Sequence, residues 1–302
     1  MLSLDKFSQE VASRVTELLD VDAQADLKKI MKNNGHELTG LVVQTADSNI
    51  APTIYLESYY EEYLAGFDMD EIMKKIAYVA GNSMVGVPFD VEIITSLDRC
   101  RDRIVPRLVN TSMNRHMLES RPHRNVEDLS VTYCVLLDND GDAAASVPVT
   151  YQLMDAWGLN ADDLYDLALE NQRIAEKSVF LSMKDVLKGF VSEESDTVDV
   201  MDGMDNDAPQ IYILSNESKL NGAAAILDST VMSRVIDQIG KRFYILPSSV
   251  HEVLIVPDMD GIRKDALESM VKEVNSSVVS IEDQLSDHVY VYSPDEGLKL
   301  AV

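Results

Sequence analysis

Residues 243–257, FYILPSSVHEVLIVP, place two runs of apolar, strand-forming residues on either side of a short polar insert. Aromatic and β-branched residues favour strands, and serine after proline is typical of a chain reversal. We therefore expect strands at 243–247 and 250–256, joined as a hairpin. The insert carries a serine pair, a histidine and a glutamate, so it could be an active site or only a connection.

The segments around this hairpin alternate between strand and helix patterns. Strands are expected at 211–214, 223–227 and 288–292, and helices at 230–239 and 263–274. Strands that follow one another between helices in this way indicate an α+β fold with a largely antiparallel sheet.

The first half of the chain has a similar make-up. Lys32-Asn33-Asn34-Gly35 is a turn signal between strands at 26–31 and 37–45, because Asn-Gly favours positive φ angles. A third strand is expected at 53–56. Helices are expected at 3–19 with Ser3 as cap, 58–65, 69–79, 151–157 and 161–172 with Asn160 as cap, and a strand at 125–137 that pairs with 143–149.

We predict two packed α+β lobes, each a mostly antiparallel sheet covered by helices, with residues 1–148 in the first and 149–302 in the second. Within the second, residues 191–209 hold seven acids and no base, which indicates a solvated loop.

Composition restricts the partners. The 302 residues include 52 acids and 26 bases, a formal net charge of −26 that repels phosphate backbones and anionic membranes. Nucleic acid and membrane are thus not expected as partners, and no segment has the roughly 20 apolar residues of a spanning helix. The first residues lack a signal-peptide pattern, and the two cysteines, Cys100 and Cys134, form no disulfide framework. We expect a soluble cytoplasmic protein.

The polar insert suggests two kinds of chemistry. His251-Glu252 begins an HExxH pattern, but Ile255 stands where the second zinc-binding histidine belongs, so no metal site is expected. Ser249 and His251 are two residues apart and would share one face of a strand, where a hydroxyl–imidazole hydrogen bond is possible. Ser248 and Glu252 are further candidates for this hydrolase site, although Glu252 is expected to face away from the pair and the G-x-S-x-G elbow is missing.

A basic cluster is the second candidate site. Its members are Arg99, Arg101, Arg103, Arg107, Arg115, Arg121 and Arg124. Guanidinium groups bind carboxylates and phosphates through paired hydrogen bonds, so Arg101, Arg103, Arg107 and Arg115 are candidates for an anion or nucleotide site. The alternative is internal pairing with the many acids of the chain. No calcium loop, phosphate-binding loop or dinucleotide fingerprint occurs, and no cofactor is expected.

Six segments together resemble a bacterial family defined only as domain of unknown function 5688. They are KNNGHELTGL, APTIYLESYYEEYLAG, RLVNTSMN, DLYDLALENQ, YILSNESKLNGAAAIL and YILPSSVHEVLIVP. The resemblance covers nearly the whole chain and implies no activity. The residues that its motifs mark as candidates for a functional site are Asn33, Asn34, Gly35, Asn110, Asn114, Asn171 and Ser248 through Glu252.

Three functions follow as alternatives to test. The first is a non-enzymatic interaction or regulatory protein with a protein partner, because the chain has no complete catalytic motif. The others are a hydrolase that uses Ser249 or Ser248 with His251, and an anion-binding or nucleotide-binding protein that uses the arginine cluster.

Overall fold

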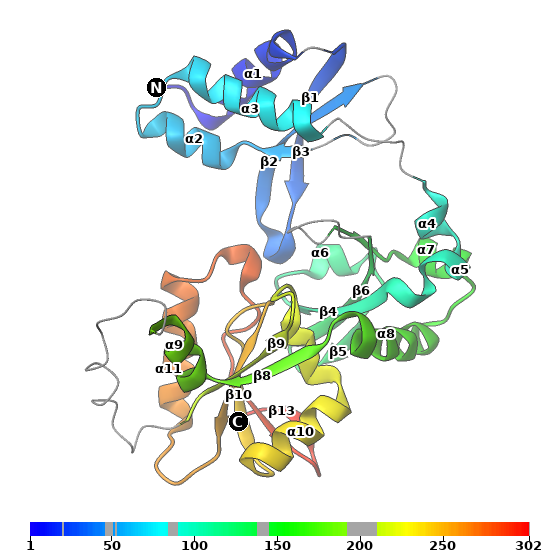
Figure 1. The fold of residues 1–302 in the computed structure, drawn as a ribbon, viewed down its shortest axis with the longest axis vertical. Helices are drawn as coiled ribbons and strands as arrows, with labels where there is room; N and C mark the ends of the chain where they lie inside the picture. Colours follow the sequence, from blue (N-terminus) through cyan, green and yellow to red (C-terminus); the bar gives the residue numbers. More distant parts are fainter. Residues whose placement is uncertain are drawn as a thin grey trace. The chain divides into compact units, whose positions relative to one another are not determined.

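The computed structural model describes residues 1–19, 21–45, 51, 53–83, 90–137, 145–191 and 210–301 (Figure 1). The chain forms two compact units, Met1–Val91 and Glu92–Val302. Within the described residues the sheets are antiparallel, so the predicted α+β class is confirmed. The two units are referred to below as unit 1 and unit 2.

Unit 1 is a three-stranded sheet with helices on one face. Its elements are α1 (Leu4–Arg14), a 3-10 turn (Val15–Leu18), β1 (Ala23–Met31), β2 (Glu37–Thr45), β3 (Thr53–Tyr55), α2 (Glu57–Leu64) and α3 (Met69–Ser83), with strand order β1-β2-β3. Phe7, Leu41 and Ile76 are buried together between the sheet and the helices. The Ser3 side chain caps α1, as predicted.

The turn between β1 and β2 confirms the Asn-Gly prediction. Asn34 and Gly35 have φ angles of 59° and 69°, which are left-handed conformations that these two residue types adopt with little strain. The strands pair antiparallel from Met31 opposite Glu37 to Ala23 opposite Thr45.

Unit 2 contains the remaining sheets. Its first part holds α4 (Glu92–Thr95), α5 (Leu97–Cys100), a 3-10 turn (Arg101–Arg103), β4 (Ile104–Asn110), α6 (Arg115–Leu118), β5 (Arg124–Val126), β6 (Leu129–Leu136), β7 (Ser146–Pro148), α7 (Tyr151–Ala156) and α8 (Ala161–Ala175). Strands β4, β6 and β5 pair in that order, and β7 also pairs with β6.

The second part of unit 2 holds the larger sheet, with strand order β13-β12-β10-β11-β9-β8. Its elements are β8 (Ser178–Ser182), α9 (Met183–Val191), β9 (Tyr212–Asn216), a 3-10 helix η5 (Gly222–Leu227), α10 (Ser229–Ile239), β10 (Phe243–Leu246), β11 (Val253–Pro257), α11 (Lys264–Ser277), a 3-10 turn (Ile281–Asp283), β12 (Tyr290–Ser293) and β13 (Gly297–Leu300). Strands β10 and β11 pair as the predicted hairpin.

One core runs through both sheets of unit 2. Cys100, Trp157, Val235 and Tyr290 belong to the same buried cluster, while α11 packs against the other face of the larger sheet. The predicted division near Pro148 differs from the boundary between the two compact units, which lies between Val91 and Glu92 in the chain. The physical reason is that α7 and α8 bury their apolar faces against strands that precede residue 148.

Two predicted elements have a different form. Residues 223–227 were expected as a strand but belong to η5, which follows Asn221 at φ 54°. The predicted strand 125–137 is two strands, β5 and β6, because Glu127 has a φ of 56° and the chain turns there. The acidic segment 192–209 and residues 138–144 lie outside the described residues.

Candidate functional site

The polar insert connects β10 to β11 and is not itself a strand. Ser249 Oγ accepts a hydrogen bond from the backbone N–H of His251 at 3.0 Å. Ser248 lies beside an apolar hollow formed by β10, β11 and α11, and Glu252 is partly buried. The expected placement of Ser249 and His251 on one strand face is therefore corrected, because β10 ends at Leu246 and β11 begins at Val253, after both residues.

The His251 ring is held by groups other than the serines. Its Nδ1 accepts from the backbone N–H of Asn221 at 3.1 Å, which places the ring proton on Nε2. Nε2 lies 3.1 Å from Oδ1 of Asp283 and donates to it. Both ring nitrogens thus have partners, whereas a general base for a serine needs one nitrogen directed at the hydroxyl.

Gly222 shows how tightly this insert packs against the β9–η5 connection. A Cβ atom at position 222 would lie 2.4 Å from Ser215 Oγ and 2.7 Å from the carbonyl oxygen of His251. Ser215 Oγ also donates to that carbonyl at 2.8 Å. These contacts join two of the segments that carry the family resemblance, and they hold the fold together.

Three buried asparagines have a similar role. Nδ2 of Asn171 donates to the carbonyl oxygens of Arg101 and Ile104, at 2.6 and 2.9 Å. Asn110 donates to the Leu285 carbonyl at 3.1 Å, and Asn114 to the Asn110 carbonyl at 2.9 Å. In each case a buried side-chain amide donates to a backbone carbonyl, as buried polar groups usually do.

The arginine cluster does not converge on one place. Arg107 forms a buried ion pair with Glu176, 2.8 Å between Nη1 and Oε2, with side chains 11% and 7% exposed. Arg99 pairs with Glu92 and Arg124 with Asp162, so internal pairing describes these three members. Arg101 and Arg115 are exposed on the 3-10 turn and on α6, and Arg103 is half-buried.

A polar hollow of about 120 Å³ lies where α8 ends, β8 begins and α10 begins. Its lining residues are Gln172, Arg173, Glu176, Ser178, Ala225, Asp228, Thr230, Val231 and Arg234. Sequence reasoning missed this hollow because its residues come from two segments, 172–178 and 225–234, that are distant in sequence. The one local signal is the helical spacing of Thr230 and Arg234, which are four apart and lie on one face of α10.

Asp228 organises one wall of the hollow. Its Oδ1 accepts from the backbone N–H and the hydroxyl of Thr230, each at 2.8 Å, and so caps α10. Arg173 Nε donates to Oδ2 at 3.0 Å. Burial alone would raise the pKa of Asp228, but the hydrogen bonds from Arg173 and Thr230 outweigh it and leave the pKa below its ordinary value.

The net charge of the hollow has the opposite sign to that of the whole chain. Asp228 forms an ion pair with Arg173, which balances the charge of both. The charge of Glu176 is balanced by Arg107, which is not a lining residue. Arg234 donates to Ser178 Oγ at 2.5 Å and has no carboxylate partner among the described residues. The hollow therefore keeps one positive charge in a chain with a net charge of −26.

Gln172 adds an unused acceptor to the same lining. The residue is 5% exposed, and its buried Oε1 has no hydrogen-bond partner in the described part of the chain. A buried acceptor without a donor costs about 1–3 kcal/mol. The Oε1 atom is closed to solvent, so a ligand in the hollow would donate to it after the Gln172 side chain turns toward the hollow.

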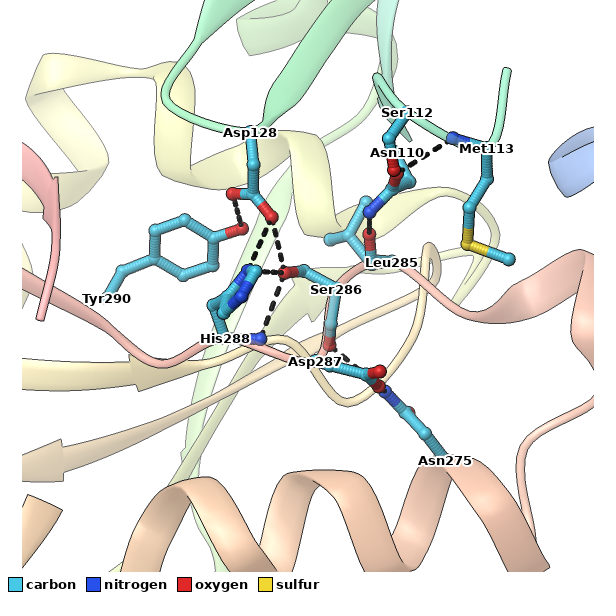
Figure 2. A network of polar contacts seen from close by, with 10 residues as sticks. All are labelled: Asn110, Ser112, Met113, Asp128, Asn275, Leu285, Ser286, Asp287, His288 and Tyr290. Carbon is cyan, nitrogen blue, oxygen red and sulfur yellow. Dashed lines mark hydrogen bonds and ion pairs between the residues drawn. The ribbon is translucent and has the colours of Figure 1, made fainter. Parts of the chain in front are cut away.

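A second polar network joins the two sheets of unit 2 (Figure 2). Asp128, in the turn between β5 and β6, accepts from Tyr290 Oη at 2.5 Å, from Ser286 Oγ at 2.8 Å and from His288 Nδ1 at 3.0 Å. Asn275 of α11 donates to the backbone carbonyl of Ser286 at 3.0 Å and extends the network. These residues lie more than 140 positions from Asp128, so sequence reasoning did not find them.

The order of groups in this network is unlike that of a serine hydrolase. In a catalytic triad, serine and aspartate face different nitrogens of the histidine. Here Ser286 donates to Asp128 itself and lies 3.5 Å from Nδ1, the same nitrogen that Asp128 binds. The arrangement is that of a carboxylate held by three donors, which links one sheet to the other.

The described residues contain no group of three or more histidine, cysteine, aspartate and glutamate side chains placed to hold a metal ion. No helix in the same residues is long and apolar enough to cross a membrane.

Comparison with known proteins identifies a family. A family model described as a family of unknown function (DUF5688) matches residues 4–294. No curated protein and no solved structure matches the chain. Because the matched residues are nearly the whole chain, the protein belongs to the DUF5688 family.

Proposed function

We propose that this is a non-enzymatic regulatory protein whose unit 2 binds a small anionic ligand in the hollow between α8, β8 and α10. The ligand carries a carboxylate or phosphate group. The observation that carries this proposal is Arg234, a guanidinium at the hollow without a carboxylate partner among the described residues. Guanidinium groups with nearby hydroxyls are suited to carboxylate and phosphate oxygens.

The lining also favours a particular kind of anion. Arg234 and Ser178 supply donors for the acidic group, because the Thr230 hydroxyl already donates to Asp228, while Gln172 Oε1 supplies a buried acceptor. The proposed ligand therefore has a hydrogen-bond donor, a hydroxyl or amino group, near its acidic group. Arg173 and Asp228 hold each other and keep the wall in place before the ligand arrives.

Calorimetric titration of the full chain tests the proposal. The probes are inorganic phosphate, adenosine triphosphate, succinate and malate, which differs from succinate by one hydroxyl. We expect saturable binding of at least one probe, with affinity that falls as salt rises. Within the carboxylates, malate should bind more tightly than succinate. Absence of saturable binding for all four would contradict the proposal.

A further inference from the structure

Strand β1 is an edge strand of unit 1. The strand order is β1-β2-β3, and within the described residues no strand pairs with the outer side of β1. Nine residues, Ala23–Met31, form this edge. Such an edge presents a row of backbone donors and acceptors that can pair with another strand.

The hydrogen bonds of the neighbouring strand show which backbone groups face outward. Lys32 N–H donates to the His36 carbonyl at 2.7 Å, so position 32 faces β2. Thr39 lies opposite Lys29. Its N–H donates to Glu57 Oε1 and its carbonyl accepts from the Leu56 N–H, so neither group bonds to Lys29. Because antiparallel ladders alternate, the odd-numbered residues of β1 direct their N–H and carbonyl groups away from β2.

The side chains of β1 divide between its two faces. Ala23, Ala25 and Leu27 pack against the core of unit 1. Asp26 and Lys28 are exposed and lie on the opposite face, on either side of Leu27. This face of the edge therefore carries one acidic and one basic side chain, symmetrically placed about Leu27, while Lys29 lies on the other face.

We propose that β1 pairs with β1 of a second copy of this chain, antiparallel and centred on Leu27. In this register the five outward residues of each strand meet those of the other, with Ala25 opposite Lys29 and Ala23 opposite Met31. Asp26 of each copy lies opposite Lys28 of the other. Opposite charges that face each other across strands stabilise the pairing.

The neighbouring registers are unfavourable. Centring the pair on Asp26 places the two aspartates opposite each other, and centring it on Lys28 does the same for the two lysines. Like charges directly opposite destabilise a strand pair. The charge order of β1 thus selects the register centred on Leu27, and a second copy is the partner that matches it along the whole strand.

Sedimentation velocity on the full chain tests the pairing, at about 0.15 M salt to screen the repulsion between two copies of this acidic chain. We expect a concentration-dependent dimer. Asp26→Lys and Lys28→Asp should each weaken it roughly ten-fold, because each replaces two attractive pairs with two repulsive ones. The double variant Asp26→Lys/Lys28→Asp restores opposite charges and should recover most of the affinity.

Both side chains are exposed, so the variants should keep their circular-dichroism spectra and melting temperatures, which is the folding control. A native chain that stays monomeric up to about 100 μM, well above ordinary specific affinities, would overturn the proposal. So would a dimer whose affinity is the same in the native chain and in both single variants, or a double variant that is weaker than each of the single ones.

Discussion

The Tyr290 hydroxyl donates to Oδ1 of Asp128 across 2.5 Å, between a buried strand of one sheet and a turn of the other. Burial alone would raise the pKa of Asp128, but hydrogen bonds from Tyr290, His288 and Ser286 outweigh it and lower the pKa below its ordinary value. Burial and the bond to Asp128 raise the pKa of Tyr290. The ionised carboxylate and the neutral phenol therefore stabilise each other.

Replacing Asp128 by asparagine should destabilise unit 2 by about 2–4 kcal/mol. The amide keeps one oxygen but cannot accept from Ser286 and His288 as well, and hydrogen bonds to a charged group contribute about 1.5–3 kcal/mol each. Urea denaturation followed by the fluorescence of Trp157, the single tryptophan, measures the change. Asp237→Asn, an exposed acid on α10, is the control and should lie within ~0.5 kcal/mol of the native chain. Equal stability of the two variants would contradict this role for Asp128.

The same carboxylate predicts a pH dependence. A folded-state pKa below the unfolded value gives stability that is present above about pH 4 and is lost as pH falls through the folded pKa. The stability difference between the native chain and Asp128→Asn should therefore shrink from pH 6 toward pH 3. Melting temperatures of both chains over this range give the measurement. A difference that stays constant would mean that ionisation of Asp128 does not contribute.

Gly222→Ala should destabilise unit 2 by about 1–3 kcal/mol, the usual cost of overpacking. The added Cβ would lie 2.6 Å from the backbone nitrogen of Asn216, which cannot move without disturbing β9. Gly81→Ala is the comparison, because nothing lies within 4 Å of its Cβ position in α3. That change should stabilise unit 1 by up to about 1 kcal/mol. Thermal melting followed by circular dichroism should show a lower melting temperature for Gly222→Ala and an equal or higher one for Gly81→Ala. An unchanged melting temperature for Gly222→Ala would contradict the close packing.

The Arg107–Glu176 pair predicts a strong coupling energy. Arg107→Met or Glu176→Gln alone should cost about 3–5 kcal/mol, because each leaves a buried charge without its partner. The double variant should cost clearly less than the sum. The pair of Arg242 and Asp258, 51% and 28% exposed, should give a coupling below about 1 kcal/mol in the same denaturation experiment. Additive losses at Arg107 and Glu176 would contradict a buried ion pair.

Local chemistry decided which parts of the fold were predictable. The Asn34-Gly35 turn, the Ser3 and Asn160 caps and the β10–β11 hairpin follow from residues next to each other in sequence, and the structure confirms them. Residues 223–227 have strand-forming apolar character, yet they form a 3-10 helix that begins at Gly222, where the chain packs closely against the His251 carbonyl. Tertiary contact overrides propensity at that point.

The candidate sites show the same distinction. The sequence shows a cluster of arginines. It does not show that Arg107 pairs with Glu176, which lies 69 positions away. The hollow depends on Arg173, Asp228 and Arg234, whose proximity comes from the packing of α8 beside η5 and α10. A serine and a histidine two apart suggested catalysis, while Asn221 and Asp283, which hold His251, come from other segments.

Calorimetry with Arg234→Gln tests the central claim most directly, using whichever of the four probes the native chain binds most tightly. Loss of the charged hydrogen bonds of Arg234 should weaken binding by roughly 10- to 100-fold. Arg242→Gln removes an equally charged side chain that pairs with Asp258 outside the hollow, and it should bind like the native chain. Equal affinity of Arg234→Gln and the native chain, or an equal loss in both variants, would contradict a binding site at this hollow.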